Sequence, residues 1–176
     1  MSMTPYINNC NYNGALTALQ YLYDGVIAGS SYNKSKILKI DQNAPIGSSM
    51  GQYAFVYVPD ICSKEKCAIH VVLHGCTQTI ADIGMKYVEN TGYNEIAEAN
   101  GIIMLYPQAK KSMFLPSNPN GCWDWYGYTN AKYHTKEGLQ MSTVYKLIQG
   151  LQNGDLEMTS VYNNEQNGEF LKSFSQ

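Results

Sequence analysis

Ala-Ile-His-Val-Val-Leu-His-Gly-Cys-Thr-Gln occupies residues 68–78 and decides the fold. An apolar run from 69 to 73 enters a tight His-Gly-Cys turn, and the near absence of polar alternation predicts a central strand covered on both faces. Residues 86–99 then have the apolar spacing of a helix, which Asn100-Gly101 ends. A second apolar run at 102–106 stops at Pro107. Strand, crossover helix and strand predict a βαβ unit with parallel pairing.

Weaker patterns surround this unit. They predict a helix at 13–23, strands at 36–40 and 53–58, a long functional loop from about 108 to 137, and a helix at 138–151. Together they predict an α/β class, namely a partial α/β-hydrolase fold with a mostly parallel sheet and flanking helices. One domain is expected over residues 1–151. The chain turns polar from Gln152, so residues 152–176 are expected to form a frayed tail.

The composition is that of a globular protein, because 44% of the 176 residues are apolar and 15% are charged. Twelve basic residues stand against 14 acidic ones, and no basic cluster exceeds Lys110-Lys111. This balance argues against nucleic acid or a membrane surface as partner. No apolar run reaches the roughly 20 residues of a membrane span. The first residues have neither a basic nor an apolar segment, so the sequence as written shows no export signal.

The five cysteines, by contrast, point to an oxidising compartment. Cys62 and Cys67 lie between two strand-like runs and are expected to close a hairpin loop as a disulfide. Free thiols and a metal site are the alternatives, but a metal would need two further ligands. Cys76 and Cys122 each lie in a loop and could pair with each other, which leaves Cys10 without a partner cysteine in the sequence. Because the ligands for a metal are missing, we expect no metal, and no motif indicates a cofactor.

No serine in the chain has the setting of a nucleophile. Residues 47–51, Gly-Ser-Ser-Met-Gly, match the G-x-S-x-G pattern. That motif needs a core strand before the serine and a helix after it, since the turn between them exposes the hydroxyl. Here Asn43-Ala44-Pro45-Ile46 comes before and a strand follows. Ser49 is therefore expected in a flexible loop, with a nucleophilic role as the alternative.

The three histidines do not supply a base with any clarity. His70 lies inside a strand and should satisfy a hydrogen bond in the core, whereas His134 should be exposed. His74 should shape the turn after the strand rather than act in a triad. A triad of Asp124 and His134 would need a serine on a strand-to-helix turn, and the serines available before Asp124 have no such setting. These residues do not build a complete Ser-His-Asp site.

Four motifs resemble one family. They are Leu73-His74-Gly75-Cys76-Thr77-Gln78, Thr91-Gly92-Tyr93-Asn94-Glu95, Leu105-Tyr106-Pro107-Gln108-Ala109 and Asn118-Pro119-Asn120-Gly121-Cys122-Trp123-Asp124-Trp125-Tyr126-Gly127-Tyr128. They are similar to motifs of extracellular poly(3-hydroxybutyrate) depolymerases and related polyester esterases, most closely of the circularly permuted, single-domain type. The opening segment 5–12 resembles the stretch just after that family's catalytic histidine. The match covers roughly residues 4–151.

The resemblance implies the C-terminal half of such an esterase, because the serine, aspartate and histidine of the permuted type come earlier in the chain. A missing N-terminal half carrying the triad would then be the partner. The resemblance gives the backbone N–H of Cys76 an oxyanion-hole role and pairs Cys76 with Cys122. It assigns contacts with a polyester or short-chain ester to Trp123, Asn120 and Tyr126, and a supporting role in the loop to His74, Gly75 and Gln78. It also implies an extracellular location.

Three hypotheses about function stay open. The chain is an esterase half-domain that is inactive alone, a non-catalytic remnant or polymer-binding protein, or a complete small esterase that uses Ser49. Trp123 and Trp125 have a structural alternative as core aromatics with satisfied N–H groups. A half-domain would also leave apolar sheet edges and faces uncovered, which predicts poor solubility.

Overall fold

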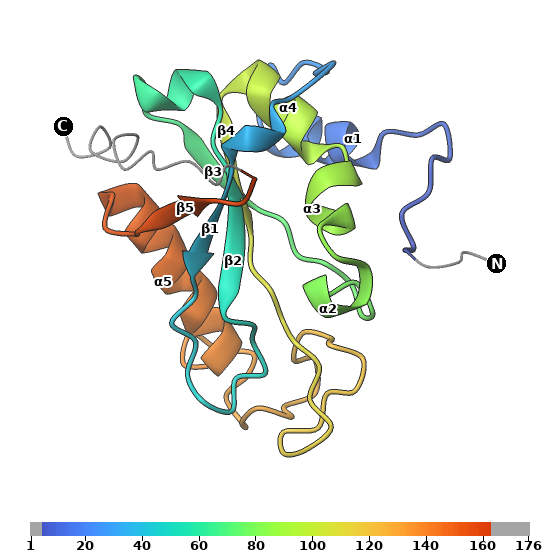
Figure 1. Cartoon of the computed structure of the whole chain (residues 1–176), viewed down its shortest axis with the longest axis vertical. Helices are drawn as coiled ribbons and strands as arrows, with labels where there is room; N and C mark the ends of the chain where they lie inside the picture. Colours follow the sequence, from blue (N-terminus) through green and yellow to red (C-terminus); the bar gives the residue numbers. More distant parts are fainter. Residues whose placement is uncertain (1–4, 163–176) are drawn as a thin grey trace.

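A five-stranded sheet lies between one long helix and a group of shorter ones in the computed structural model, which describes residues 5–162 (Figure 1). The strand order is β3-β4-β2-β1-β5. The strands are β1 (Ile37–Asp41), β2 (Tyr53–Tyr57), β3 (Ala68–Val71), β4 (Ile102–Tyr106) and β5 (Met158–Ser160). The α/β class is thus confirmed.

Pairing within the sheet is mixed. β3 and β4 are parallel, as the βαβ pattern predicts, with Ala68 opposite Ile102. The β2–β4, β1–β2 and β1–β5 pairs are antiparallel, so the expectation of a mostly parallel sheet holds only for the first pair. The loop at 42–52 returns β1 directly into the antiparallel β2, whereas a parallel pair such as β3 and β4 needs a crossover connection.

The strand expected at the centre is at an edge. β4 lies between β3 and β2 and is buried at all five positions, whereas no residue of β3 is fully buried. The apolar run at 69–73 therefore predicts more burial than β3 has in the described residues. The outer edge of β3 pairs with no described strand.

Helices cover both faces of the sheet (Figure 1). One side carries α1 (Gly14–Leu22), α2 (Ile80–Ile83), α3 (Lys86–Asn90) and α4 (Tyr93–Asn100), and the other carries α5 (Leu139–Asn153). Alternation along β4 serves both layers, because Met104 packs with Leu19 and Ile96 while Leu105 packs with Leu147. The single helix expected at 86–99 is two helices, since Gly92 adopts φ 82° between them.

Beyond residue 151 the chain stays ordered further than expected. α5 continues to Asn153, and β5 then pairs with β1, placing Met158 opposite Ile40 in the core. The burial of the Met158 side chain stabilises β5 even though the residues around it are mostly polar. The rest of the predicted tail, residues 163–176, lies outside the described residues.

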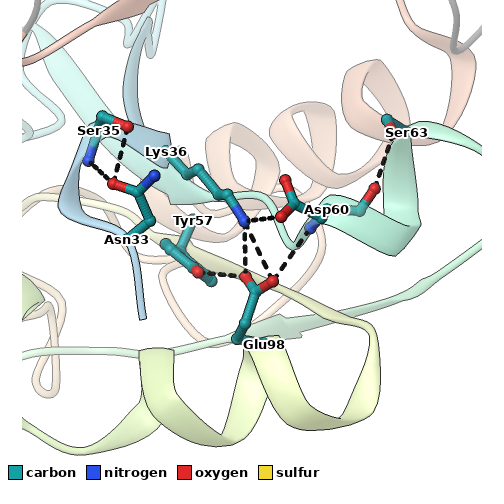
Figure 2. Close-up of polar contacts among 7 residues, drawn as sticks. All are labelled: Asn33, Ser35, Lys36, Tyr57, Asp60, Ser63 and Glu98. Atoms are coloured by element: carbon teal, nitrogen blue, oxygen red, sulfur yellow. Dashed lines mark hydrogen bonds and ion pairs between the residues drawn. The ribbon is translucent and has the colours of Figure 1, made fainter. Parts of the chain in front are cut away.

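A charged cluster ties the start of β1 to the rest of the fold, as Figure 2 shows. The Nζ of Lys36 lies 2.6 Å from a carboxylate oxygen of Asp60 and 3.1 Å from one of Glu98, which also accepts from the Tyr57 hydroxyl. Burial alone would lower the pKa of Lys36, but the two carboxylates outweigh it and raise that pKa.

The Cys62–Cys67 disulfide is present and closes the short 3-10 helix Asp60–Ser63 onto the start of β3. The loop is not a hairpin, because β4 separates β2 from β3. In the described part of the chain, no helix has the length and apolar character needed to cross a bilayer.

Candidate functional site

The loop after β3 is fixed around one buried histidine. His74 is 2% exposed, and its ring packs 5.4 Å from the ring of Trp123 and 6.1 Å from that of Tyr87 (centroid to centroid). Its Nδ1 lies 2.8 Å from the carbonyl oxygen of Gly75, and its Nε2 lies 3.1 Å from the backbone nitrogen of Ala109. The carbonyl can only accept and the amide can only donate. His74 is therefore neutral, with its proton on Nδ1.

Burial lowers the pKa of His74, and the hydrogen bond to Gly75 and the charge of Asp82 offset this only in part. Both ring nitrogens are used by the backbone, so neither is available to take a proton from a nucleophile. The structural role expected for His74 fits this geometry.

Among the four backbone amides from Gly75 to Gln78, three donate to acceptors within the described residues and one does not. The N–H of Gly75 donates to Oε1 of Gln78 (2.8 Å), that of Thr77 to the carbonyl of Asn120 (2.7 Å), and that of Gln78 to the carbonyl of Gly75 (3.3 Å). Within residues 5–162, the N–H of Cys76 has no acceptor, and Cys76 is exposed. An exposed, fixed donor of this kind is what an anionic oxygen requires.

A long loop at 108–137 is bonded to this turn. The Cys76–Cys122 disulfide joins them, with 4.3 Å between the two Cα atoms. Trp123 follows directly, and its indole N–H donates to the carbonyl of His74 at 3.0 Å. Trp123 is half-buried, which leaves part of its ring open beside the turn. The site and the aromatic loop therefore form one unit.

Asp124 organises the aromatic part of the loop. Its carboxylate accepts from the backbone N–H groups of Gly127 (2.7 Å), Tyr128 (3.0 Å) and Thr129 (2.9 Å), and from the Thr129 hydroxyl (2.6 Å). Burial raises the pKa of Asp124, but these hydrogen bonds outweigh it and lower the pKa overall. An aspartate held in this way fixes a loop, and in the described residues no histidine bonds to it.

Ser49 is not in a flexible loop, contrary to expectation. It is 4% exposed, its hydroxyl donates to the carbonyl of Lys110 (3.0 Å), and it accepts from the side-chain amide of Asn118 (3.2 Å). Asn118 also donates to the carbonyl of Cys122 and accepts from the N–H of the same residue, each at 2.9 Å. Satisfying these buried polar groups holds Ser49 in place. No helix follows it, and its hydroxyl faces no histidine.

The other predicted residues are distributed as follows. Asn120 is exposed and bonds to the turn through its carbonyl. Tyr126 is 58% exposed and Trp125 is 72% exposed, so Trp125 is not a core aromatic. Gln78 also donates to the carbonyl of Pro5 (3.1 Å), which connects the N-terminal segment to the turn. His134 is exposed as expected.

His70 is half-buried rather than deep in the core. It lies 3.3 Å from the Tyr23 hydroxyl and stacks on Tyr93, and burial lowers its pKa. No histidine in residues 5–162 therefore completes a triad. The same residues hold no group of three His, Cys, Asp or Glu side chains that could bind a metal.

Two features were missed from the sequence. The first is an exposed apolar tip, Met113-Phe114-Leu115, whose residues are 75%, 85% and 97% exposed beyond the bridge between Ser112 and Asn118. An apolar run inside a polar loop is the signal that could have identified it. The second is an open groove of about 880 Å³ beside Gln78, lined by the N-terminal segment and by Tyr87 and Tyr93. Its walls come from distant segments, so no local pattern indicates it.

Comparison with known proteins identifies the family. A family model described as "Esterase PHB depolymerase" matches residues 52–162. The chain belongs to the PHB depolymerase esterase family. A polyhydroxybutyrate depolymerase of Talaromyces funiculosus is 36% identical over 166 residues, covering 88% of this chain and 49% of the relative. A poly(3-hydroxybutyrate) depolymerase of Delftia acidovorans is 37% identical over 156 residues, covering 85% of this chain and 31% of the relative.

Solved PHB depolymerase structures share the fold. One, in complex with an R3HB trimer, superposes with a TM-score of 0.79 at 36% identity, covering 85% of this chain and 51% of the other. The PHB depolymerase of Penicillium funiculosum gives a TM-score of 0.78 at 35% identity, with the same coverage. The family predicted from the motifs is therefore confirmed. The chain spans about half the length of these structures and half or less of the two sequence relatives.

Proposed function

We propose that this chain provides the oxyanion-binding amide and the substrate-contacting loop of a PHB depolymerase-type esterase. The observation that carries the proposal is the N–H of Cys76, which has no acceptor in the described residues while three neighbouring amides are bonded. Such a donor needs no reorganisation when negative charge develops on a carbonyl oxygen.

In this reaction, a serine hydroxyl attacks the ester carbonyl carbon, its proton passes to the histidine, and the π electrons move onto the carbonyl oxygen. The Cys76 N–H donates to that oxygen. When the carbonyl re-forms, the ester C–O bond breaks and the alcohol leaves with the proton from the histidine. Water then hydrolyses the acyl-serine and releases the acid. A second N–H and the serine, aspartate and histidine come from outside the described residues, since those residues hold no triad. The neutral His74 and the Cys76–Cys122 disulfide hold the donor in position.

The open edge of β3 supports a location for the serine. In an α/β-hydrolase the nucleophile lies on a strand-to-helix turn at the top of the sheet, and one oxyanion donor lies in the loop after the third strand of that fold. The turn at 74–76 follows β3 of this chain in the same way. A strand that pairs in parallel with the free side of β3 would end beside the turn at 74–76. We therefore place the strand that carries the serine along this edge.

The proposed substrate is an aliphatic polyester or its short-chain esters. Trp123 and Tyr126 offer partly exposed ring faces, and the tip at 113–115 adds apolar surface in the same loop. Asn120 is exposed in the same loop, and its side-chain amide can donate to an ester carbonyl of the polymer. Apolar surface next to an oxyanion donor suits an ester polymer with aliphatic repeats. The disulfides favour an extracellular location.

Complementation tests this function. The chain is mixed with a separately produced polypeptide that comprises the half of the Talaromyces funiculosus depolymerase it does not match, and p-nitrophenyl butyrate hydrolysis is measured. We expect hydrolysis in the mixture and none from either part. Cys76→Pro removes the N–H, whereas Cys76→Ala removes the same disulfide and keeps the N–H. The proline variant should be about 10²–10³-fold slower than the alanine variant.

Equal rates for the two variants would refute the oxyanion role. Hydrolysis by the chain alone that Ser49→Ala abolishes would support a complete small esterase instead. The second candidate function is polymer binding without catalysis, which the exposed tip and the lack of a triad in residues 5–162 favour. Binding to a polyester film, with no hydrolysis in any mixture, would establish it.

A further inference from the structure

Asn33-Lys34-Ser35 is an acceptor sequence for N-linked glycans. It fits the pattern Asn-x-Ser/Thr with a residue other than proline in the middle. Nowhere else in the 176 residues does an asparagine stand two places before a serine or threonine with a non-proline residue between. The pattern alone is common, so its meaning depends on where the folded chain places the asparagine.

The side chain of Asn33 is presented to solvent by a turn just before β1. Asn33 is exposed, and its Oδ1 accepts from the backbone N–H of Ser35 (3.0 Å) and from the Ser35 hydroxyl (2.8 Å), as Figure 2 shows. Its amide nitrogen has no partner among residues 5–162. The nitrogen that would receive the sugar is thus the free end of an otherwise fixed amide.

Ion pairs of the two neighbouring lysines hold the turn, and the exposed Asn33 side chain takes no part in them. A bulky group on Asn33 would therefore displace nothing in the core. Lys36 is clamped by Asp60 and Glu98 directly after the turn, and Lys34 pairs with Glu89 at 2.9 Å. These contacts all use side chains other than that of Asn33. The turn therefore has its own support before and after modification.

The position also keeps a glycan away from the loops at 74–76 and 122–126. β1 is antiparallel to β2, and β2 is antiparallel to β4, so β1 runs in the same direction as β4 and β3. Asn33 precedes β1 and the turn at 74–76 follows β3, so the two lie at opposite ends of the sheet. Figure 1 shows the start of β1 and the chain after β3 at these two ends. A glycan on Asn33 would therefore leave the turn at 74–76 open.

We infer that Asn33 carries an N-linked oligosaccharide when the chain passes through a secretory pathway that contains an oligosaccharyltransferase. The inference rests on the proposed extracellular location but on no part of the esterase chemistry. The donor is an oligosaccharide linked to a polyprenyl diphosphate. The Asn33 amide nitrogen forms a bond to the sugar C1 and loses one proton, while the bond from C1 to the diphosphate oxygen breaks and the polyprenyl diphosphate leaves. The disulfides Cys62–Cys67 and Cys76–Cys122 fit such a compartment.

The test is secretion of the full chain from a yeast host behind a leader peptide, followed by peptide N-glycosidase treatment in heavy-oxygen water and peptide mapping. We expect a mobility shift that the enzyme removes, and aspartate with heavy oxygen at position 33. Asn33→Gln and Ser35→Ala should each abolish the shift, while Ser35→Thr should retain it. Asn43→Gln changes an exposed asparagine outside the pattern and should leave the shift unchanged.

Two results would overturn the inference. One is an unmodified Asn33 peptide from chain in which both disulfides have formed. The other is a glycan at another asparagine with Asn33 free. Because Ser35→Ala and Ser35→Thr both keep Asn33, a folding defect in Asn33→Gln would not obscure the answer. Ester hydrolysis is not measured, so failure of the esterase proposal would leave this result unaffected.

Discussion

Replacing His74 with phenylalanine should destabilise the protein measurably while keeping the ring contacts around it. Phenylalanine has a similar shape, so the packing against Trp123 and Tyr87 is largely retained. What the substitution removes is the Nε2 acceptor for the Ala109 N–H and the Nδ1 donor to the Gly75 carbonyl. The experiment therefore isolates the polar role of this side chain.

The two lost bonds are unequal in cost. The Gly75 carbonyl still accepts from the Gln78 N–H, but Ala109 is 2% exposed and its N–H would have no acceptor. An unsatisfied buried donor costs about 1–3 kcal/mol, so we expect a loss of about 2 kcal/mol in the free energy of unfolding. For a domain of this size, that loss corresponds to a fall in Tm of roughly 4–8 °C.

Urea unfolding followed by tryptophan fluorescence measures this loss, since Trp123 lies against the His74 ring. His134→Phe is the matched control, because His134 is exposed in the same long loop and its replacement should change stability by less than about 0.5 kcal/mol. If His74→Phe and His134→Phe unfold at the same urea concentration as the wild type, the reasoning about the buried amide is wrong.

The same variant has a predicted pH dependence. Burial lowers the pKa of His74 in the folded state, so the unfolded chain binds that proton at a higher pH than the folded chain does. Wild-type stability should therefore fall as the pH drops below about 6.5, the ordinary value for histidine. His74→Phe should lose part of this fall, with the half-buried His70 responsible for a remainder. An unchanged slope in the variant would contradict the assignment.

Three further changes probe the loop. Replacing Cys76 and Cys122 together with alanine opens a loop with sequence separation 46 and should cost about 4 kcal/mol in urea unfolding, against about 2 kcal/mol for the disulfide with separation 5. Asp124→Asn should cost about 2 kcal/mol at pH 7. Because the folded pKa of Asp124 is lowered, that difference should shrink as the pH falls below the ordinary aspartate value and disappear below the folded pKa, which a series of urea denaturations at decreasing pH from pH 7 would reveal. Phe114→Ser, at an 85% exposed position, should reduce adsorption to a polyester film several-fold with no change in the urea midpoint.

Local patterns predicted the elements of this fold better than their arrangement. The strands at 102–106 and 53–58 and the helix at 138–151 follow from apolar spacing, which depends on neighbours in the chain. The edge position of β3 depends on which strands pair, and an apolar run contains no information about its partners. The break at Gly92 was missed because the apolar spacing continues through it on both sides.

In the candidate site, too, features set by neighbouring residues were predictable and features set by distant residues were not. The turn at 74–76 could be predicted because its motif is continuous, and the pairing of Cys76 with Cys122 came from the resemblance. The burial of Ser49 could not, since its partners at 110 and 118 lie more than 60 residues away. An isolated match to a short pattern says nothing about whether the hydroxyl is free.

The side of β3 that pairs with no strand in residues 5–162 has a consequence for the chain during synthesis. An exposed strand edge can pair with any other extended segment, including β3 of a second copy. Contact between two copies becomes faster as the protein concentration rises, whereas pairing with a covalently attached strand occurs at a fixed effective concentration. In the proposed arrangement, newly made protein therefore either pairs edge to edge with a second copy, at a rate that rises with concentration, or binds the strand that carries the serine along β3. Dilution should favour the second.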